Sequence, residues 1–201
     1  MVETVGQPDV GRVQLVLALR NSGDEYEATR HNAGDWFVTA LAAAVSTEFS
    51  VRSRLLCEEG RSGDVRLARS CTYMNESGRA AAALAGFYRI APANILIVHD
   101  EMDLPVGQVR LKFAGGIAGH NGLRDVRNSL GSAGFWRLRI GIGRPAEYVD
   151  PANYVLAAPA TEQRRLINAG IIRAVEVWPA IAAGDMNAAM LDLHSRADVP
   201  E

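Results

Sequence analysis

The sequence has few cysteines, no long apolar run and no leader-like N-terminus. Its two cysteines, Cys57 and Cys71, are too few for a disulfide framework and lack the spacing of metal ligands. The longest apolar stretches, residues 37–45 and 80–88, fall well below the roughly 18 residues of a membrane-spanning helix. Residues 1–12 carry two acidic side chains and no long apolar segment, which argues against a signal peptide. We therefore expect a cytoplasmic protein without a membrane span.

Repeats and low-complexity segments are absent too, and the composition is that of an ordinary folded domain. The chain has 201 residues, of which 48% are hydrophobic and 22% charged, enough for a core without disulfide or metal support. This length predicts a single domain. We place the domain at residues 13–194, with a mobile N-terminal extension at residues 1–12 and a C-terminal tail at residues 195–201.

Short apolar runs alternate with helical patterns along the chain. Strands are predicted at residues 13–19, 94–99, 108–113 and 136–142, and a hairpin from residues 51–57 and 65–70 around a turn at residues 60–64. Helices are predicted at residues 36–45, from just after Ser77 to about residue 88, from the glycine-rich loop 114–122 to residue 130, at residues 162–183 with a break at Pro179, and at residues 185–194. This alternation predicts an α/β domain with a largely parallel central sheet.

Positive charge is concentrated in one segment of a chain whose formal net charge is −2. Between residues 110 and 144, seven basic side chains accompany the single acid Asp125. Such a local excess predicts a phosphate-binding face. The alternative, equally open on charge alone, is a solvated surface whose counter-charges are brought in by folding.

Polar side chains with catalytic potential follow the predicted strands, where open α/β sheets place their sites. They form four clusters: Asn21 and Tyr26 with residues 29–34 (TRHNAG), residues 72–75 (TYMN), residues 99–105 (HDEMDLP) and residues 119–122 (GHNG). Three of these side chains are histidines, His31, His99 and His120. A lone histidine is more often a capping or core residue. Together, a histidine, an aspartate to orient it and several amides suit general-base hydrolysis by water, with the amides binding a peptide-like group.

Other chemistries fit the sequence less well. Residues 131–134 (GSAG) have the wrong spacing for a nucleophile elbow, and residues 116–122 (GIAGHNG) match neither G-x-G-x-x-G nor a P-loop. His99, Asp100 and Asp103 are metal ligands by type, which leaves a metal-dependent phosphohydrolase as one alternative. Because their spacing is not typical of a metal site, we expect neither a metal nor a cofactor.

In order and separation, the clusters resemble those of bacterial-type peptidyl-tRNA hydrolases. The most specific segments are residues 25–37 (EYEATRHNAGDWF), 72–78 (TYMNESG), 99–107 (HDEMDLPVG), 119–125 (GHNGLRD) and 135–145 (FWRLRIGIGRP). The resemblance, which runs from about residue 13 to residue 194, implies a single domain with a twisted mixed sheet flanked by helices. It implies hydrolysis of the ester that joins a peptide to the 3′-terminal ribose of tRNA, by a monomer.

The resemblance also implies roles for individual residues. His31 would be the general base that activates water, and Asp100 would accept a hydrogen bond from its imidazole. Asn21 would discriminate N-blocked from free aminoacyl-tRNA. Asn75 and Asn121 would pair with peptide groups of the substrate.

Four further residues match substrate-binding positions of the family. Tyr26 and Tyr73 stand at aromatic positions near the scissile ester, where a base or ribose can stack. Lys112 and Arg139 match a pair that grips the tRNA 5′-phosphate. Because both lie on predicted strands that flank the glycine-rich loop, we expect them side by side on one sheet.

The sequence departs from the family pattern at two places, and one alternative shares its scaffold. Arg20 and Ser22 stand where the family usually has Gly and Pro, which bears on the placement of Asn21 because glycine allows a positive φ. Ile117 and Ala118 replace residues that are usually Gly or His. A non-catalytic RNA-binding protein of the same fold is the alternative. The complete set of histidine, aspartate and amides favours the enzyme.

Overall fold

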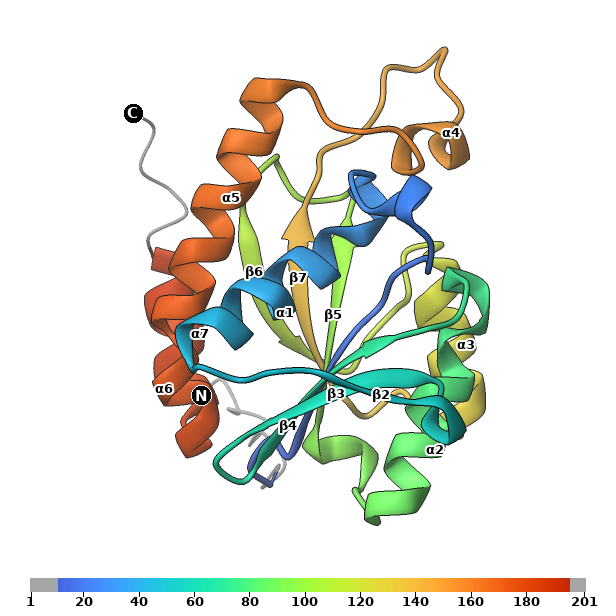
Figure 1. The fold of residues 1–201 in the computed structure, drawn as a ribbon. Helices are drawn as coiled ribbons and strands as arrows, with labels where there is room; N and C mark the ends of the chain where they lie inside the picture. The colour runs from blue at the N-terminus through green and yellow to red at the C-terminus, as the bar shows by residue number, and fades with distance from the viewer. Residues whose placement is uncertain (1–10, 196–201) are drawn as a thin grey trace, which may run out of the picture.

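Seven short segments pair into one sheet in the computed structural model, which describes residues 11–195 (Figure 1). The strands are β1 (Leu15–Ala18), β2 (Ser50–Arg52), β3 (Cys57–Ser62), β4 (Val65–Ser70), β5 (Ile95–Glu101), β6 (Val109–Phe113) and β7 (Trp136–Gly141). Their order is β2-β3-β4-β1-β5-β7-β6. The pairs β4–β1, β1–β5 and β5–β7 are parallel, and the pairs β2–β3, β3–β4 and β6–β7 are antiparallel. The predicted mixed sheet is confirmed, but it is less parallel than expected, because three of its six strand pairs are antiparallel.

Helices cover both faces of this sheet (Figure 1). They are α1 (Ala33–Ala44), α2 (Ser77–Tyr88), α3 (Asn121–Leu130), α4 (Pro151–Val155), α5 (Thr161–Glu176), α6 (Trp178–Ala183) and α7 (Met186–Ser195). Short 3₁₀ turns are η1 (Asp24–Tyr26), η2 (Arg30–Asn32), η3 (Ser53–Leu55), η4 (Met74–Glu76) and η5 (Pro92–Asn94). α1, α5, α6 and α7 pack on one face, and α2 and α3 on the other.

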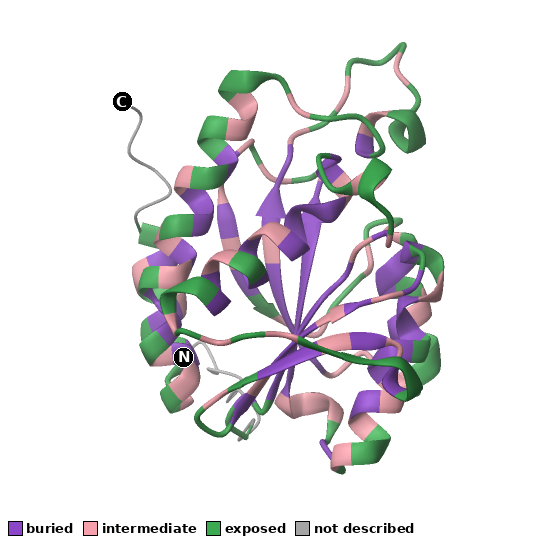
Figure 2. Cartoon of the chain, viewed as in Figure 1, coloured by how far each residue is buried: buried purple, intermediate pink, exposed green. Residues whose placement is uncertain are grey.

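The central strands are buried on both faces, as Figure 2 shows. In β1, Val16 and Ala18 pack toward α1, while Leu15 and Leu17 pack toward α2 and α3. This division follows from the alternation of side chains along a strand, and it explains why the sequence of β1 is continuously apolar. Two hydrophobic cores, one on each face, therefore hold the sheet in place.

The predicted hairpin is wrong in its first strand. Residues 51–57 split between β2 and η3, and the strand that pairs with β4 is β3, which contains Gly60. A Cβ at Gly60 would lie 2.5 Å from the carbonyl oxygen of Glu48 and 2.4 Å from Thr47 Cγ2. The glycine thus allows residues 47 and 48 to cross the strand closely, and does not mark a turn.

The ends of the chain are only partly described. Residues 1–10 of the expected extension, and residues 196–201 of the expected tail, lie outside the described residues. Asn94 Nδ2 donates a hydrogen bond to the carbonyl oxygen of Arg12 at 2.9 Å, so the chain contacts the domain from Arg12 onward. Within residues 11–195, every helix is too short or too polar to cross a membrane.

Candidate active site

The carboxyl ends of β4, β1 and β5 lie side by side because these strands are parallel neighbours. Asn21 follows β1, residues 72–75 follow β4, and Asp100 lies near the end of β5. His31 lies in η2, immediately before α1, whose first turns pack against β1 and β5. The predicted polar clusters thus meet at one edge of the sheet, as expected for an α/β site.

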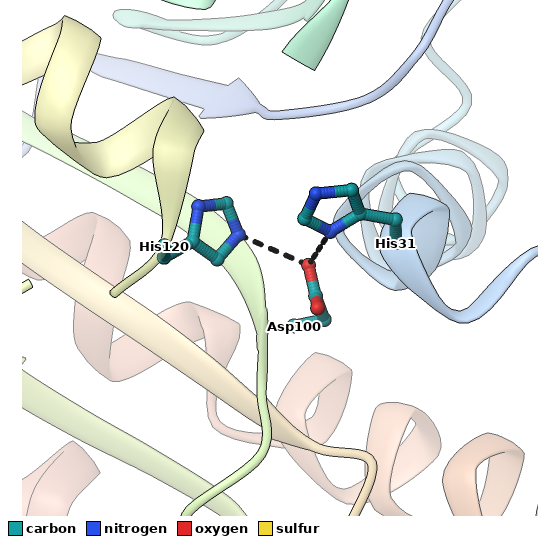
Figure 3. Close-up of side chains that lie close together, drawn as sticks. All are labelled: His31, Asp100 and His120. Atoms are coloured by element: carbon teal, nitrogen blue, oxygen red, sulfur yellow. Dashed lines mark hydrogen bonds and ion pairs between the residues drawn. The ribbon is translucent and has the colours of Figure 1, made fainter. Parts of the chain in front are cut away.

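Two imidazoles share one carboxylate oxygen at this edge (Figure 3). His31 Nδ1 lies 2.8 Å from Asp100 Oδ1, and His120 Nε2 lies 3.0 Å from the same atom. The backbone N–H of Leu123 donates to His120 Nδ1 at 3.3 Å, so the proton of this ring is on Nε2 and points to Asp100. His31 likewise donates from Nδ1, which leaves its Nε2 with a free lone pair. That nitrogen is therefore able to accept a proton.

Burial and charge tune these groups in opposite directions. Asp100 is 3% exposed, and this burial by itself raises the pKa of its carboxyl. The charges and hydrogen bonds of His31 and His120 have the larger, opposite effect, so the net pKa of Asp100 lies well below its usual range. Burial lowers the pKa of His31, but the charge and hydrogen bond of Asp100 outweigh it, so the net pKa is raised above 6.5. Asp100 therefore stays ionised and strengthens His31 as a base.

His99 is a core residue and contributes no side chain to the site. It is fully buried, and its Nδ1 lies 2.6 Å from the carbonyl oxygen of Asp100. Burial, followed by the charge of nearby His120, lowers the pKa of His99 well below its ordinary value. Its neighbour in the predicted metal set, Asp103, instead pairs with Arg144 at 2.6 Å. The structure does not bring His99, Asp100 and Asp103 together as ligands.

Among residues 11–195, the one grouping with the spacing of metal ligands is His31, Asp100 and His120, whose ligand atoms lie within 4.8 Å of one another. His31 Nδ1 and His120 Nε2 each already form a hydrogen bond with Asp100 Oδ1. A metal at His120 Nε2 would require the other tautomer, whose Nδ1–H would face the backbone N–H of Leu123. The hydrogen bonds of the three residues therefore orient both imidazoles on one carboxylate.

A cavity of about 300 Å³ opens onto the two histidines. One side is formed by the glycine-rich loop and the start of α3. The opposite wall comes from α4 and the residue before it: Asp150, Pro151, Ala152 and Val155. The sequence analysis missed both this wall and the role of His120, although Asp150 followed by Pro151 is a helix-start signal.

Arg30, the neighbour of His31, holds this wall in place. Its Nη1 donates to the carbonyl oxygens of Tyr154, Ala157 and Ala158 at 2.9–3.2 Å, and its Nη2 donates to Gln163 Oε1 at 2.8 Å. The guanidinium also lies 4.1 Å from the centre of the Tyr154 ring. The segment after α4 is therefore tied to the turn that carries the base.

Asn21 is 7% exposed and is fixed from two sides. Its backbone N–H donates to Asn32 Oδ1 at 2.8 Å, and Asn32 Nδ2 donates back to its carbonyl oxygen at 3.0 Å. The backbone N–H of Met74 donates to Asn21 Oδ1 at 2.7 Å. Because the oxygen is used, the amide presents its NH₂ group as a donor.

The other predicted substrate contacts lie at the surface beside this edge. Asn75 and Asn121 are exposed, and Asn121 Oδ1 accepts a hydrogen bond from Arg124 at 3.1 Å. Asn121 lines the cavity. Tyr26 and Tyr73 pack edge to face with ring centroids 6.4 Å apart, and Tyr73 is largely exposed. Tyr26 is partly buried, so Tyr73 is the more accessible of the two rings.

Lys112 and Arg139 lie on neighbouring strands and on the same face of the sheet. The β6–β7 register pairs Lys112 with Arg137 and Arg110 with Arg139, which makes Lys112 and Arg139 diagonal neighbours. Lys112 is exposed, whereas Arg139 Nε lies 3.0 Å from Glu101 Oε2. Folding thus brings one counter-charge to Arg139.

The departures from the family pattern are accommodated locally. The backbone at Arg20 does not have a positive φ, so no glycine is required there. Ala118 does have a positive φ of 46°, as does Ala114 at 54°. The loop between them is anchored by Arg137, which donates to the carbonyl oxygens of Ala114 and Gly116.

Comparison with protein families gives one match over nearly the whole chain. The sequence model of the family described as peptidyl-tRNA hydrolase matches residues 15–200. The peptidyl-tRNA hydrolase of Azoarcus sp. (strain BH72) is 49% identical over 185 residues, covering 91% of this chain and 85% of that protein. That of Thiobacillus denitrificans is 46% identical, covering 96% of each chain.

A solved structure agrees with these sequence comparisons. The crystal structure of peptidyl-tRNA hydrolase from Acinetobacter baumannii is similar to this one with a TM-score of 0.86 and 38% sequence identity. The similarity covers 90% of this chain and 94% of that chain. The sheet order and the helices on both faces are therefore those of a known fold.

Proposed function

This chain belongs to the peptidyl-tRNA hydrolase family and cleaves peptidyl-tRNA, and we propose that it does so by general-base hydrolysis with His31 as the base. The observation that carries this proposal is the 2.8 Å hydrogen bond between His31 Nδ1 and the buried carboxylate of Asp100. It fixes the ring and its tautomer, so that Nε2 is ready to accept a proton.

The proposed reaction uses water as the nucleophile. Nε2 of His31 takes a proton from the water while the oxygen bonds to the carbonyl carbon of the ester, and Asp100 stabilises the imidazolium that forms. The bond from that carbon to the 3′-terminal ribose oxygen then breaks, and the ribose oxygen receives the proton from His31. The products are the free peptide and tRNA.

We assign the choice of substrate to the amide of Asn21. An N-blocked aminoacyl group carries an acyl carbonyl, which accepts a hydrogen bond, whereas a free aminoacyl group carries an ammonium, which only donates. Asn21 presents a donor because Met74 occupies its oxygen. A donor facing an ammonium leaves both groups without an acceptor, which disfavours the free form.

The remaining contacts bind the rest of the substrate. Asn75 and Asn121 pair with peptide groups, and Tyr26 and Tyr73 stack on the 3′-terminal nucleotide. Lys112 and Arg139 bind the 5′-phosphate. We further propose that the enzyme acts as a cytoplasmic monomer, as the resemblance to the family implies.

Deacylation of two matched substrates tests the proposal. N-acetylaminoacyl-tRNA and the same tRNA with a free amino group are incubated with the protein, with and without a chelator of transition metals. Cleavage of the blocked substrate alone, unaffected by the chelator, is expected. Loss of activity with the chelator would favour the metal-dependent alternative, and binding without cleavage would favour the RNA-binding alternative.

A further inference from the structure

The turn that carries Asn21 is joined to the segment after β4 by a short ladder of hydrogen bonds. Ser22 N–H donates to the carbonyl oxygen of Thr72 at 3.2 Å, next to the bond between Met74 and Asn21. Ser70 Oγ donates to the carbonyl oxygen of Arg20 at 3.4 Å. The orientation of the Asn21 amide therefore depends on how these two segments are held together.

One side chain, that of Arg20, reaches both the end of β4 and the helix after His31. Its Nε donates to the carbonyl oxygen of Ser70 at 2.8 Å, where β4 ends. Its Nη1 donates to Asp35 Oδ2 at 3.4 Å, four residues beyond His31 in α1. Its Nη2 lies 3.6 Å from Glu58 Oε1 in β3.

The contacts between Arg20 and Asp35 are largely buried from solvent. The side chains of Arg20 and Asp35 are each 12% exposed. Burial raises the pKa of Asp35, and the charges of Arg20 and Arg69 only partly oppose that rise. Arg69 completes the group through Asp35 Oδ1 at 3.8 Å and through Glu58. Removing either arginine takes one positive charge away from the buried carboxylate of Asp35. Of the two arginines, Arg20 is the one that also belongs to the Asn21 turn.

We propose that Arg20 is a positioning residue, which fixes the amide of Asn21 relative to His31 and so sets the preference for N-blocked over free aminoacyl-tRNA. The inference rests on the proposed role of Asn21. Arg20 does not touch the substrate in this account. It keeps the Asn21 turn against the end of β4, so that Met74 N–H continues to occupy Oδ1 and the NH₂ group stays the donor of the amide.

The test compares Arg20→Met with Arg69→Met. Methionine keeps an apolar stem and removes the charge and the donors. For Arg20→Met we expect the ratio of kcat/KM for blocked over free substrate to fall about 3- to 10-fold, mainly through a higher KM for the blocked substrate. Arg69→Met removes the other arginine of the same group, so it reports the effect of lost charge compensation on Tm. For Arg69→Met, the ratio of kcat/KM for blocked over free substrate should stay at the wild-type value. If Arg20→Met does not fold, Arg20→Lys replaces it, because one ammonium cannot make all three contacts.

A double-mutant cycle with Asn21→Ala separates the inference from the proposed function. If Arg20 acts through Asn21, Arg20→Met lowers the ratio no further in the Asn21→Ala background. An unchanged ratio in Arg20→Met, an equal fall in Arg69→Met, or additive effects in the double variant would overturn the inference while leaving the role of Asn21 intact. An unchanged ratio in Asn21→Ala itself would overturn both.

Discussion

At the scale of single residues, the central feature is a carboxylate that serves two imidazoles. Asp100 Oδ1 accepts from both His31 and His120, and its burial concentrates the effect of its charge on these rings. Sequence motifs identified His31 and Asp100, because each stands in a distinctive segment. They left His120 unassigned, because a histidine that caps a helix and one that donates to a carboxylate look the same in a sequence. Here His120 does both.

The pH dependence of the rate should report this carboxylate. His31 acts when neutral and its pKa is raised, so kcat/KM of the wild type should rise with pH through an apparent pKa above 6.5. Asp100→Asn removes the charge that raises the pKa and leaves burial, which lowers it. We therefore expect the rising limb to move to lower pH, with a plateau below that of the wild type. If the rising limb of the pH profile of kcat/KM is at the same pH in Asp100→Asn and in the wild type, Asp100 does not raise the pKa of His31.

A second residue, His99, should make the free energy of unfolding depend on pH between pH 6.5 and 5. Its folded-state pKa lies well below 6.5, so below pH 6.5 the unfolded chain binds a proton that the folded chain does not. The free energy of unfolding should then fall with decreasing pH, by up to about 1.4 kcal/mol per unit from this group. Urea unfolding of the wild type and His99→Gln between pH 6.5 and 5 measures it: the variant should show a shallower slope. Equal slopes would show that His99 does not titrate as its burial requires.

At the scale of elements, close approach of backbones sets the position of the base. A Cβ at Gly34, in the first turn of α1, would lie 2.4 Å from the carbonyl oxygen of Val98. α1 can therefore bring His31 up to β5 only because this residue is glycine. Sequence patterns predicted α1, α2, α3 and β5 well, because helical spacing or alanine-rich segments marked the first two helices, a glycine-rich loop marked the start of the third, and a continuous apolar run marked the strand. They misplaced β3, because a glycine in a strand and a glycine in a turn look alike until the crossing chain at residues 47 and 48 is seen.

Two glycine substitutions test this view of α1. Gly34→Ala should destabilise the protein by about 1–3 kcal/mol, because the methyl group meets backbone atoms that cannot move aside, and should lower kcat by displacing His31. Gly86→Ala in α2 is the matched control, since a Cβ there has no neighbour within 4 Å. It should stabilise by about 0.4–1 kcal/mol. Urea unfolding of both variants measures the difference, and similar values for the two would refute the close-approach argument.

At the scale of the whole molecule, the proposed phosphate contact lies where positive charge gathers on the strands β6 and β7. β6 is an edge strand, and Lys112 on it is exposed. Arg139 beside it is partly compensated by Glu101. Arg139→Ala would leave buried Glu101 without this partner, so Lys112 is the residue at which phosphate binding can be tested without disturbing the fold.

Lys112→Ala should raise KM about tenfold for tRNA with a 5′-phosphate, with little change in kcat, because the contact is remote from the ester. The effect should shrink at high salt and should be small for a substrate without the 5′-phosphate. Arg61→Ala, an exposed cation in β3 toward the other edge of the sheet, is the control and should change neither value. Equal effects of Lys112→Ala on both substrates would defeat the phosphate contact.

The most direct measurement is the turnover of N-acetylaminoacyl-tRNA by His31→Ala. His31 lies at the cavity and, within residues 11–195, its ring forms a hydrogen bond with Asp100 alone, so the variant should fold and bind tRNA with nearly unchanged Kd. Its kcat should fall by about 10²–10⁴-fold, the contribution of a general base. A kcat within about tenfold of the wild type, with the fold intact, would contradict the account, because a base is worth more than that factor.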